Sequence, residues 1–240
     1  MELALLLGLA ALFTSAITAA MGVGGGVVLL ALMGQFVPPA MLIPLHGAAQ
    51  LMSNTSRVLV QRKHICWSYI RPFAVGAALG GALLTPLALL IPPEFGQVLL
   101  GVFILVATWR ASWLRLANWH PAGSGGITTG LSLVLGATGP LVMSVLPKGQ
   151  WPKEVLAGTH GMAMAIQHGI KLVAFTTVGF DWAAHWPLLL AIGVATLAGN
   201  ILGARLLQRI PEEYFSRILN LLLSALALRL IYQGLANLNA

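Results

Sequence analysis

The stretch from His46 to Arg57 reads HGAAQLMSNTSR, and the stretch from His160 to Lys171, 114 residues later, reads HGMAMAIQHGIK. Both begin with His-Gly and end with a basic residue. The offset of 114 relates further positions, and it drifts to 115 and then to 119 later in each copy. The other matched positions are Gly22 and Gly136, Gly25 and Gly139, Pro38 and Pro152, Trp67 and Trp182, Pro72 and Pro187, and Ile91-Pro92 and Ile210-Pro211. We therefore expect two structural repeats, at residues 1–120 and 127–240, joined by a flexible linker at 121–126.

The composition is that of a membrane protein. Hydrophobic residues make up 58% of the 240-residue chain and charged residues only 8%, whereas a soluble domain carries roughly 25% charged residues. Such a chain cannot cover a surface that faces water, so a lipid bilayer must surround most of it. A net charge of +7 would suggest nucleic acid as the partner of a soluble protein. Here the basic residues lie at the ends of apolar segments, so they indicate membrane topology and no nucleic-acid binding.

The apolar segments predict an all-α polytopic membrane protein, because none of them alternates in the manner of a barrel strand. Glycine and proline separate the segments. Two of the segments also carry the small-residue pattern that lets membrane helices approach closely, at Gly76-x-x-x-Gly80 and Gly199-x-x-x-Gly203. The segments run at about 3–20, 25–36, 40–61, 69–91, 95–115, 126–147, 155–176, 185–208 and 214–235.

The charged residues predict how these segments cross the membrane. If segment 126–147 enters and returns to the same side, every basic cluster is cytoplasmic and every acidic turn is external, as the positive-inside rule requires. By analogy, residues 3–36 form the matching broken, re-entrant hairpin, although the arm 3–20 is long enough to cross and this alternative stays open. The basic clusters lie at 61–71, 109–125, 148–154 and 209–213, and the acidic turns at 92–94 and 177–184.

Each repeat is then a broken helical hairpin followed by three transmembrane helices. Three crossings are an odd number, so the second repeat is inverted relative to the first. Inverted repeats are typical of secondary transporters, in which the substrate lies where the halves meet, at segments interrupted by glycine. The alternative is a gene duplication that merely doubled a helical bundle. We expect the two repeats to form one membrane domain, and a homo-oligomer stays open.

Polar residues follow one face of two matched segments. His46, Gln50, Ser53 and Arg57 are spaced i, i+4, i+7 and i+11, which places them on one side of a helix. The matching face of 155–176 carries His160, Met164, Gln167 and Lys171, with His168 beside it. Polar residues inside a membrane helix are costly and normally face a cavity or the bundle interior. Two stripes that each end in a cation predict the walls of an anion path. The alternatives are that Arg57 snorkels to the boundary and that the histidines bond neighbouring carbonyls.

The glycine clusters predict a second anion-binding device. A broken helix presents free backbone N–H groups and the positive end of its dipole, and Gly24 to Gly26 would let that backbone approach a ligand. Thr138 would add a hydroxyl in the other half, and the alternative is close helix packing. The predicted substrate-binding residues are Gly24, Gly25, Gly26, His46, Gln50, Ser53, Asn54, Arg57, Thr138, Gly139, His160, Gln167, His168 and Lys171.

Several classes of site are disfavoured by what the sequence lacks. All six acidic residues lie near segment ends or in loops, so no buried carboxylate serves a proton or sodium relay, and coupling would have to use histidine. A cationic substrate would find nothing to neutralise it. The sequence predicts no catalytic residue, no metal site and no cofactor. Two other classes stay open: a non-transporting membrane scaffold or accessory subunit, and an intramembrane enzyme, which would need a nucleophile or a metal set.

The positions of glycine and proline resemble those of the TauE/SafE family of membrane transporters, over nearly the whole chain. The resemblance implies transport of sulfite, sulfoacetate or another small sulfur-containing or organic anion across the bacterial inner membrane. The second copy departs from the family pattern at residues 136–140, which read GATGP where a glycine triplet is expected, so the two halves of the site need not be alike. The resemblance rests on Gly22, Gly24–Gly26, Pro38-Pro39, Trp182, Gly203-Ala204-Arg205 and Ile210-Pro211-Glu212.

Overall fold

The computed structural model is all-helical, as expected from the sequence. It describes residues 2–21, 24–110, 113, 119–147, 150–206 and 212–238, and these contain ten α-helices and no strand. Gly22, Arg115, Lys148 and residues 209–211 of the basic cluster predicted at 209–213 lie outside the described residues. The α-helices are α1 (Glu2–Met21), α2 (Gly25–Met33), α3 (Pro39–Gln61), α4 (Trp67–Leu89), α5 (Pro93–Trp109), α6 (Pro121–Leu135), α7 (Gly139–Val145), α8 (Lys153–Thr177), α9 (Trp186–Leu206) and α10 (Glu212–Leu238), and the short 3₁₀-helices are η1 (Arg62–His64) and η3 (Ala183–His185).

Proline fixes where three of these helices begin. Pro38, Pro92 and Pro152 are the N-cap residues of α3, α5 and α8, each with a φ near −55° and an extended ψ. Proline has no N–H to lose there, and its ring cannot be accommodated one turn further into a helix without breaking a hydrogen bond. The breaks between segments that the sequence predicted at these prolines are confirmed, and a helix begins after each of them.

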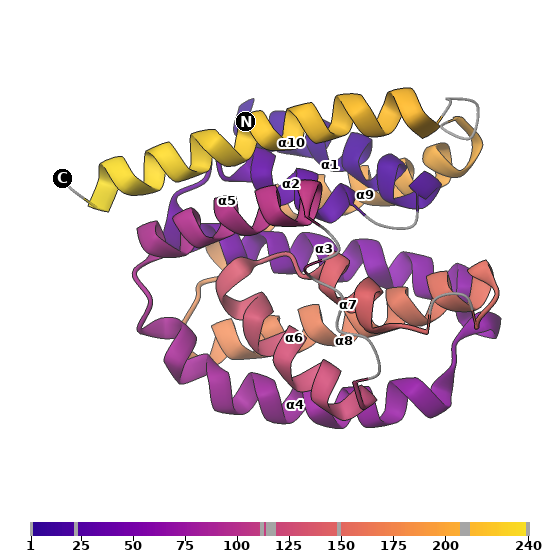
Figure 1. The fold of residues 1–240 in the computed structure, drawn as a ribbon. Coiled ribbons are helices and arrows are strands. Elements are labelled where there is room, and N and C mark those ends of the chain that lie inside the picture. The colour runs from indigo at the N-terminus through magenta and orange to yellow at the C-terminus, as the bar shows by residue number, and fades with distance from the viewer. Residues whose placement is uncertain are drawn as a thin grey trace.

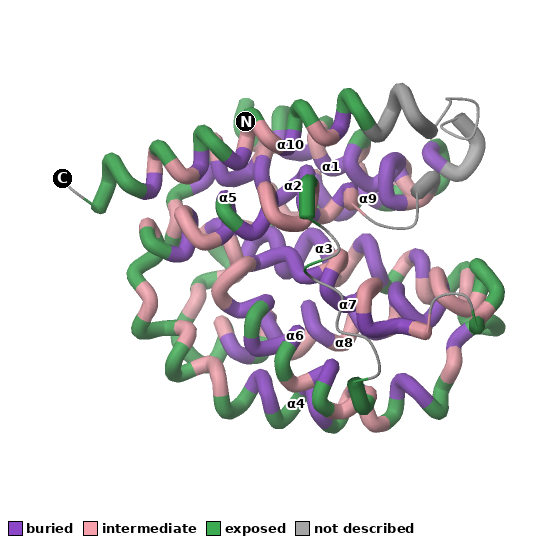
Figure 2. The backbone as a smooth tube through the Cα atoms, in the orientation of Figure 1, coloured by how far each residue is buried: buried purple, intermediate pink, exposed green. Residues whose placement is uncertain are grey.

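Four helices are long and apolar enough to cross a membrane, within the parts of the chain that the structure describes. They lie at Glu2–Ala19, Trp67–Leu89, Ala183–Gly203 and Arg217–Leu238. Large apolar side chains on the outer faces of these helices are exposed, among them Leu79, Leu83, Ile201 and Leu221. Figure 2 shows the contrast with α3, which is largely buried in the interior. Apolar residues that face outward fit a lipid solvent, so the chain is a membrane protein.

The helices of the two halves pack in matching pairs. α1 packs along α9, and its counterpart α6 packs along α4; α3 packs on α8, and α5 on α10 (Figure 1). Each broken hairpin therefore lies against a helix of the opposite half. Equivalent glycines make equivalent contacts, because a β-carbon at Gly80 would strike the Gly126 backbone and one at Gly199 would strike the Leu12 backbone. The close helix approach predicted from the two small-residue patterns is confirmed.

The two central helices run antiparallel. A β-carbon at Gly47 would lie 2.9 Å from Lys171 Cδ, and one at Gly161 would lie 3.8 Å from Val58 Cγ2. Further along, a β-carbon at Gly158 would lie 3.1 Å from the His64 carbonyl oxygen. Positions late in α3 thus meet positions early in α8. Opposite directions for equivalent helices are what an inverted repeat needs, although the orientation of the halves in a bilayer stays a prediction.

The interpretation of residues 121–126 as a flexible linker is wrong, because these residues form the first part of α6. Pro121 begins the helix, and Nδ1 of His120 accepts a hydrogen bond from the Ala122 N–H at 3.3 Å. Gly125 lies against the Phe73 carbonyl of α4 and leaves no room for a β-carbon. A run of glycine and serine suggests flexibility in water, but between membrane helices the same small residues permit tight packing.

Candidate functional site

A small polar cavity lies between the two halves of the chain. Its volume is about 30 Å³, which is room for roughly one water molecule. The helices α3 and α8 provide its long walls, and the starts of α2 and α7 close it from the sides, with α1 contributing one residue. The lining consists of Thr18, Gly24, Gly26, Val27, His46, Gln50, Asn54, Arg57, Ala137, Gly139, Pro140, His160, Met164 and His168.

The polar stripe of α3 is buried along its whole length. His46 is completely buried and Arg57 is only 7% exposed, so Arg57 does not snorkel to a boundary. The side-chain N–H of Asn54 donates to the Gln50 carbonyl at 2.8 Å. Arg57 Nη1 lies 3.5 Å from the Asn54 side-chain oxygen, at the limit of a hydrogen bond. Asn54 is therefore held by its own helix and directs its oxygen toward the guanidinium, which lines the cavity.

The two matched histidines make the same contact in both halves. Nε2 of His46 lies 2.9 Å from the Gly26 carbonyl oxygen, and Nε2 of His160 lies 3.1 Å from the Gly139 carbonyl oxygen. Because a carbonyl only accepts, each Nε2 carries a proton and donates it. Each histidine thus ties a long helix to the first turn of the broken helix in its own half. The carbonyl contact that the sequence left as an alternative is present, and both rings still line the cavity.

The first glycine cluster combines an unusual backbone with a close approach. Gly24 is the N-cap of α2 and has a φ of +109°, a region that L side chains rarely adopt. A β-carbon at Gly25 would strike the Thr14 carbonyl oxygen, and one at Gly26 would lie 2.9 Å from the Gln50 side-chain oxygen. The first N–H groups of a helix have no carbonyl partner within that helix. The start of α2 lies at the cavity, because Gly24, Gly26 and Val27 line it, and the N–H groups of Val27 and Val28 bond to the Gly24 carbonyl.

In the second half, the corresponding polar groups bond to one another. Thr138 Oγ1 donates to the Gln167 side-chain oxygen at 3.0 Å, and the Gln167 N–H donates to Thr128 Oγ1 at 2.6 Å. Lys171 Nζ donates to the Gly136 carbonyl at 2.6 Å and is completely buried. Gly136 itself has a φ of +76°. These bonds join α6, α7 and α8 and keep three predicted site residues out of the cavity lining.

His168 differs from the other two histidines. Its side chain is 1% exposed, and neither ring nitrogen has a hydrogen-bond partner among the described residues. It lines the cavity, and its ring lies edge to face with that of His46, with the centroids 5.9 Å apart. Leaving a buried polar group unsatisfied costs about 1–3 kcal/mol. Such a side chain inside a cavity is suited to bonding a ligand.

The structure gathers nine of the fourteen predicted site residues around one cavity. The five that do not line it are Gly25, Ser53, Thr138, Gln167 and Lys171, although each is buried. Thr18, Val27, Ala137 and Pro140 line it without having been predicted, and Met164, which the sequence placed on the stripe of segment 155–176, lines it as well. The offset of 114 carries a signal for Thr18, because it matches the hydroxyls of α1 with those of α6. The matched pairs are Thr14 and Thr128, Ser15 and Thr129, and Thr18 and Ser132, all buried.

A buried, cation-lined cavity between two matched helical halves, with two broken helices pointing at it, defines a polytopic membrane protein of the transporter class. Within the described residues, no group of three or more His, Cys, Asp or Glu side chains could hold a metal ion. The family model for the sulfite exporter TauE/SafE matches residues 7–230, and the chain therefore belongs to this family of membrane transporters. No curated protein and no solved structure matches the chain.

Proposed function

We propose that the chain is a secondary transporter that moves a small anion across the bacterial inner membrane. The substrate class that the site suits is sulfite, an organosulfonate or a similar small sulfur-containing or organic anion. The observation that carries the proposal is the Arg57 guanidinium, buried in the bundle and lining a cavity between the halves. No acidic side chain is found among the residues that line it. A buried guanidinium at a cavity whose lining residues carry no carboxylate favours an anionic ligand.

Three further groups of the site suit the oxygens of such an anion. His168 offers ring nitrogens that have no partner within the described chain. The first turn of α2 offers backbone N–H groups and the positive end of a helix dipole. Gln50 offers a side-chain amide at the same cavity. Sulfite and sulfonates carry three oxygens on one sulfur. Once the halves move apart enough to admit more than the one water molecule for which the cavity has room, donors from α2, α3 and α8 can each bond a different oxygen.

The arrangement of the halves suits alternating access. The long walls of the cavity come from opposite halves, since α3 belongs to the first and α8 to the second. Each broken hairpin packs against a helix of the other half, so the two hairpins occupy equivalent places. A fixed site between two such units can open to either side when one unit rocks against the other. No covalent chemistry is needed, and the polar residues of the cavity act as ligands.

The proposal is tested by anion uptake into proteoliposomes that contain the purified chain. A radiolabelled alkanesulfonate is the better probe, since it stays charged and does not leak through lipid, and radiolabelled sulfite is the second. Uptake should exceed that of protein-free liposomes, saturate with concentration and fall in the Arg57→Ala variant. Arg62, an exposed residue of η1, provides the matched control as Arg62→Ala. Uptake no greater than in protein-free liposomes for either probe, with folded protein, would overturn the proposal.

A further inference from the structure

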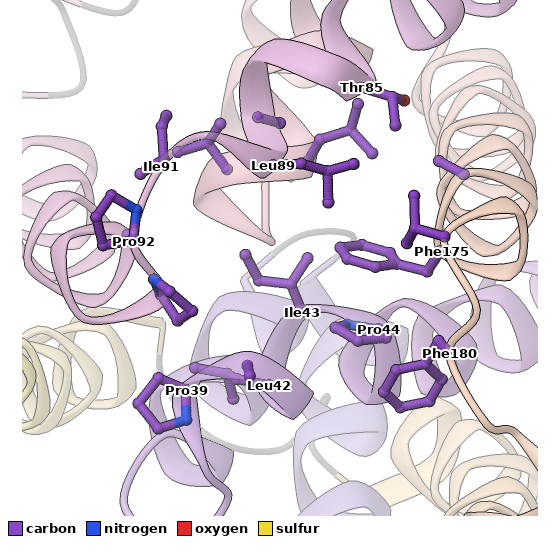
Figure 3. Close-up of a pocket in the computed structure, with 18 of the residues that line it drawn as sticks. Pro39, Leu42, Ile43, Pro44, Thr85, Leu89, Ile91, Pro92, Phe175 and Phe180 are labelled. Atoms are coloured by element: carbon purple, nitrogen blue, oxygen red, sulfur yellow. The ribbon is translucent and has the colours of Figure 1, made fainter.

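A second and larger cavity lies beside the polar site. It encloses about 310 Å³ between the start of α3, the end of α4, the start of α5, the end of α6 and the end of α8. Its walls are mostly apolar. Figure 3 shows Ile43, Leu89 and Phe175 directed into the same space, with Pro39, Pro92 and Phe180 around it. The cavity is an order of magnitude larger than the polar site, and nothing in the proposed function accounts for it.

Three separate elements place this apolar cavity next to the polar site. On α3, Ile43 lines the apolar cavity, and His46, one turn later, lines the polar site. On α8, Ala174 lines the apolar cavity, and His168, less than two turns earlier, lines the polar site. The same holds at the end of α6 and the break after it, where Val134 of α6 lines the apolar cavity and Ala137 of the break lines the polar site.

The residues between these pairs separate the two spaces. On α8, Lys171 lies between the two lining residues, and in the break Gly136 lies between them. Lys171 Nζ donates a hydrogen bond of 2.6 Å to the Gly136 carbonyl oxygen. A β-carbon at Gly136 would lie 3.6 Å from Ile43 Cγ1, so the break also rests on α3. The aliphatic stem of Lys171 packs against Gly47, which also lies on α3. Lys171 therefore lies across the boundary between the cavities, with its charge held by a backbone carbonyl.

The apolar cavity lies at the side of the protein that the charge pattern predicts to be external. Its wall includes Ile91 to Pro93, beside Glu94, and Val178 to Phe180, beside Asp181. Acidic turns are typical of the external face. The polar site reaches in the opposite direction, because Arg57 lies near the end of α3 that leads to Arg62 and Lys63 of η1. The two matched cations thus lie at opposite ends of the site.

The two cations are also in different states. Arg57 lines the polar site, whereas Lys171 does not and bonds to the Gly136 carbonyl. Resting on the proposed function, we propose that the apolar cavity is the external vestibule of the anion path, and that Lys171, bonded to Gly136, is the barrier between the vestibule and the site. Lys171 is then a gating residue, and its counterpart Arg57 is a ligand. Release of the Gly136 carbonyl frees the Lys171 ammonium to meet an anion entering from outside.

The test measures the accessibility of single cysteines to a membrane-impermeant thiol reagent applied from outside to intact cells, in a Cys66→Ala background. Ala174→Cys reports on the vestibule, and Met164→Cys reports on the site. Ala174→Cys should react in every background. Met164→Cys should react slowly with Lys171 present and at least tenfold faster with Lys171→Ala. Lys171→Met keeps the bulk but loses the hydrogen bond, and it should give a smaller increase. Arg62→Ala, at an exposed residue of η1, is the matched control and should give none.

Two results would overturn the inference. If Ala174→Cys does not react from outside, the apolar cavity is no external vestibule. If Ala174→Cys reacts but Met164→Cys is equally slow with Lys171, Lys171→Met and Lys171→Ala, Lys171 is no barrier. The reaction of Ala174→Cys in each background also shows that the variant has folded and reached the membrane. Labelling does not depend on transport, so a failed uptake assay with this labelling pattern intact would count against the proposed function alone.

Discussion

The imidazole rings of His46 and His168 meet edge to face at the centre of the bundle, with their centroids 5.9 Å apart, and they come from opposite halves of the chain. His46 is tied to the Gly26 carbonyl, whereas His168 has no partner within the described residues. This pair marks the level at which the antiparallel helices α3 and α8 face the cavity. Going from it toward η1 leads to Arg57, and going the other way leads to Lys171. The predictions below follow from this order.

Arg57→Ala should weaken anion binding and leave the fold intact. A hydrogen bond to a charged group contributes about 1.5–3 kcal/mol, so the apparent dissociation constant should rise roughly ten- to a hundredfold. The measurement is the ligand-induced shift in melting temperature of purified protein over a series of anion concentrations. Lys171→Ala is the internal comparison, because its ammonium is occupied by Gly136. Equal losses of affinity in the two variants would show that both cations bind the anion directly.

Two neighbouring residues of α8 should behave in opposite ways. Gln167 bonds Thr128 and Thr138, so Gln167→Ala should lower the melting temperature, at a cost of about 1–3 kcal/mol, and change anion affinity little. His168 bonds no described residue, so His168→Asn should fold normally. The same variant should bind the anion severalfold more weakly, because the ring nitrogens that reach it are lost.

One result would contradict the role of His168 as an anion ligand. If His168→Asn lowers the melting temperature as much as Gln167→Ala does and binds the anion as wild type does, His168 is a packing residue. A His168→Leu variant provides a stricter test, because leucine has a similar size but its side chain can form no hydrogen bond. It should bind the anion more weakly than His168→Asn.

The fold was predictable from sequence where local chemistry decides it. Proline determines the starts of α3, α5 and α8 because its missing N–H suits the beginning of a helix. The glycines at 24–26 break the first hairpin because the backbone there needs a positive φ at Gly24 and close contact at Gly25. The 3.6-residue period likewise brought His46, Gln50 and Arg57 to one cavity.

The remaining features depend on partners that a helical period does not reveal. Gln167 and Lys171 share a face of α8 with His160, yet Thr138 and Gly136 from other elements engage them. Whether a polar side chain meets a ligand or a neighbour is decided by these long-range contacts. The packing of Gly125 likewise depends on a long-range contact, because this residue of α6 lies against the Phe73 carbonyl of α4. The apolar cavity also arises only when five helices come together.

Cysteine labelling should place Gln150 in the cytoplasm and Asp181 outside. Both residues are exposed, and the positive-inside rule assigns the basic stretches 61–71 and 148–154 to one side and the acidic turn 177–184 to the other. The measurement uses Gln150→Cys and Asp181→Cys in a Cys66→Ala background, with an impermeant reagent on intact cells and on opened cells. Gln150→Cys should react only after the cells are opened. External labelling of Gln150→Cys would contradict the inverted-repeat topology.

Substitutions of the glycines at the start of α2 should impair transport for different reasons. A β-carbon at Gly25 would strike the Thr14 carbonyl, so Gly25→Val should abolish transport by disrupting the packing of α2 on α1. Gly24 has open space around it but a φ of +109°, so Gly24→Ala should cost about 1–3 kcal/mol of backbone strain and still fold. Gly139→Val should also abolish transport. Position 25 should be the more sensitive of the two, because Pro140 already restricts the backbone next to Gly139.

Melting temperature and anion-induced stabilisation, measured on each purified variant, separate these causes. Gly25→Val should show a large fall in melting temperature, whereas Gly24→Ala should show a small fall together with a weaker response to the anion. Gly123, which also has open space around it and lies outside the site, provides the control as Gly123→Ala. If Gly25→Val melts at the wild-type temperature and responds fully to the anion, the start of α2 is neither a tight contact nor part of the binding site, and the anion must be held by side chains alone.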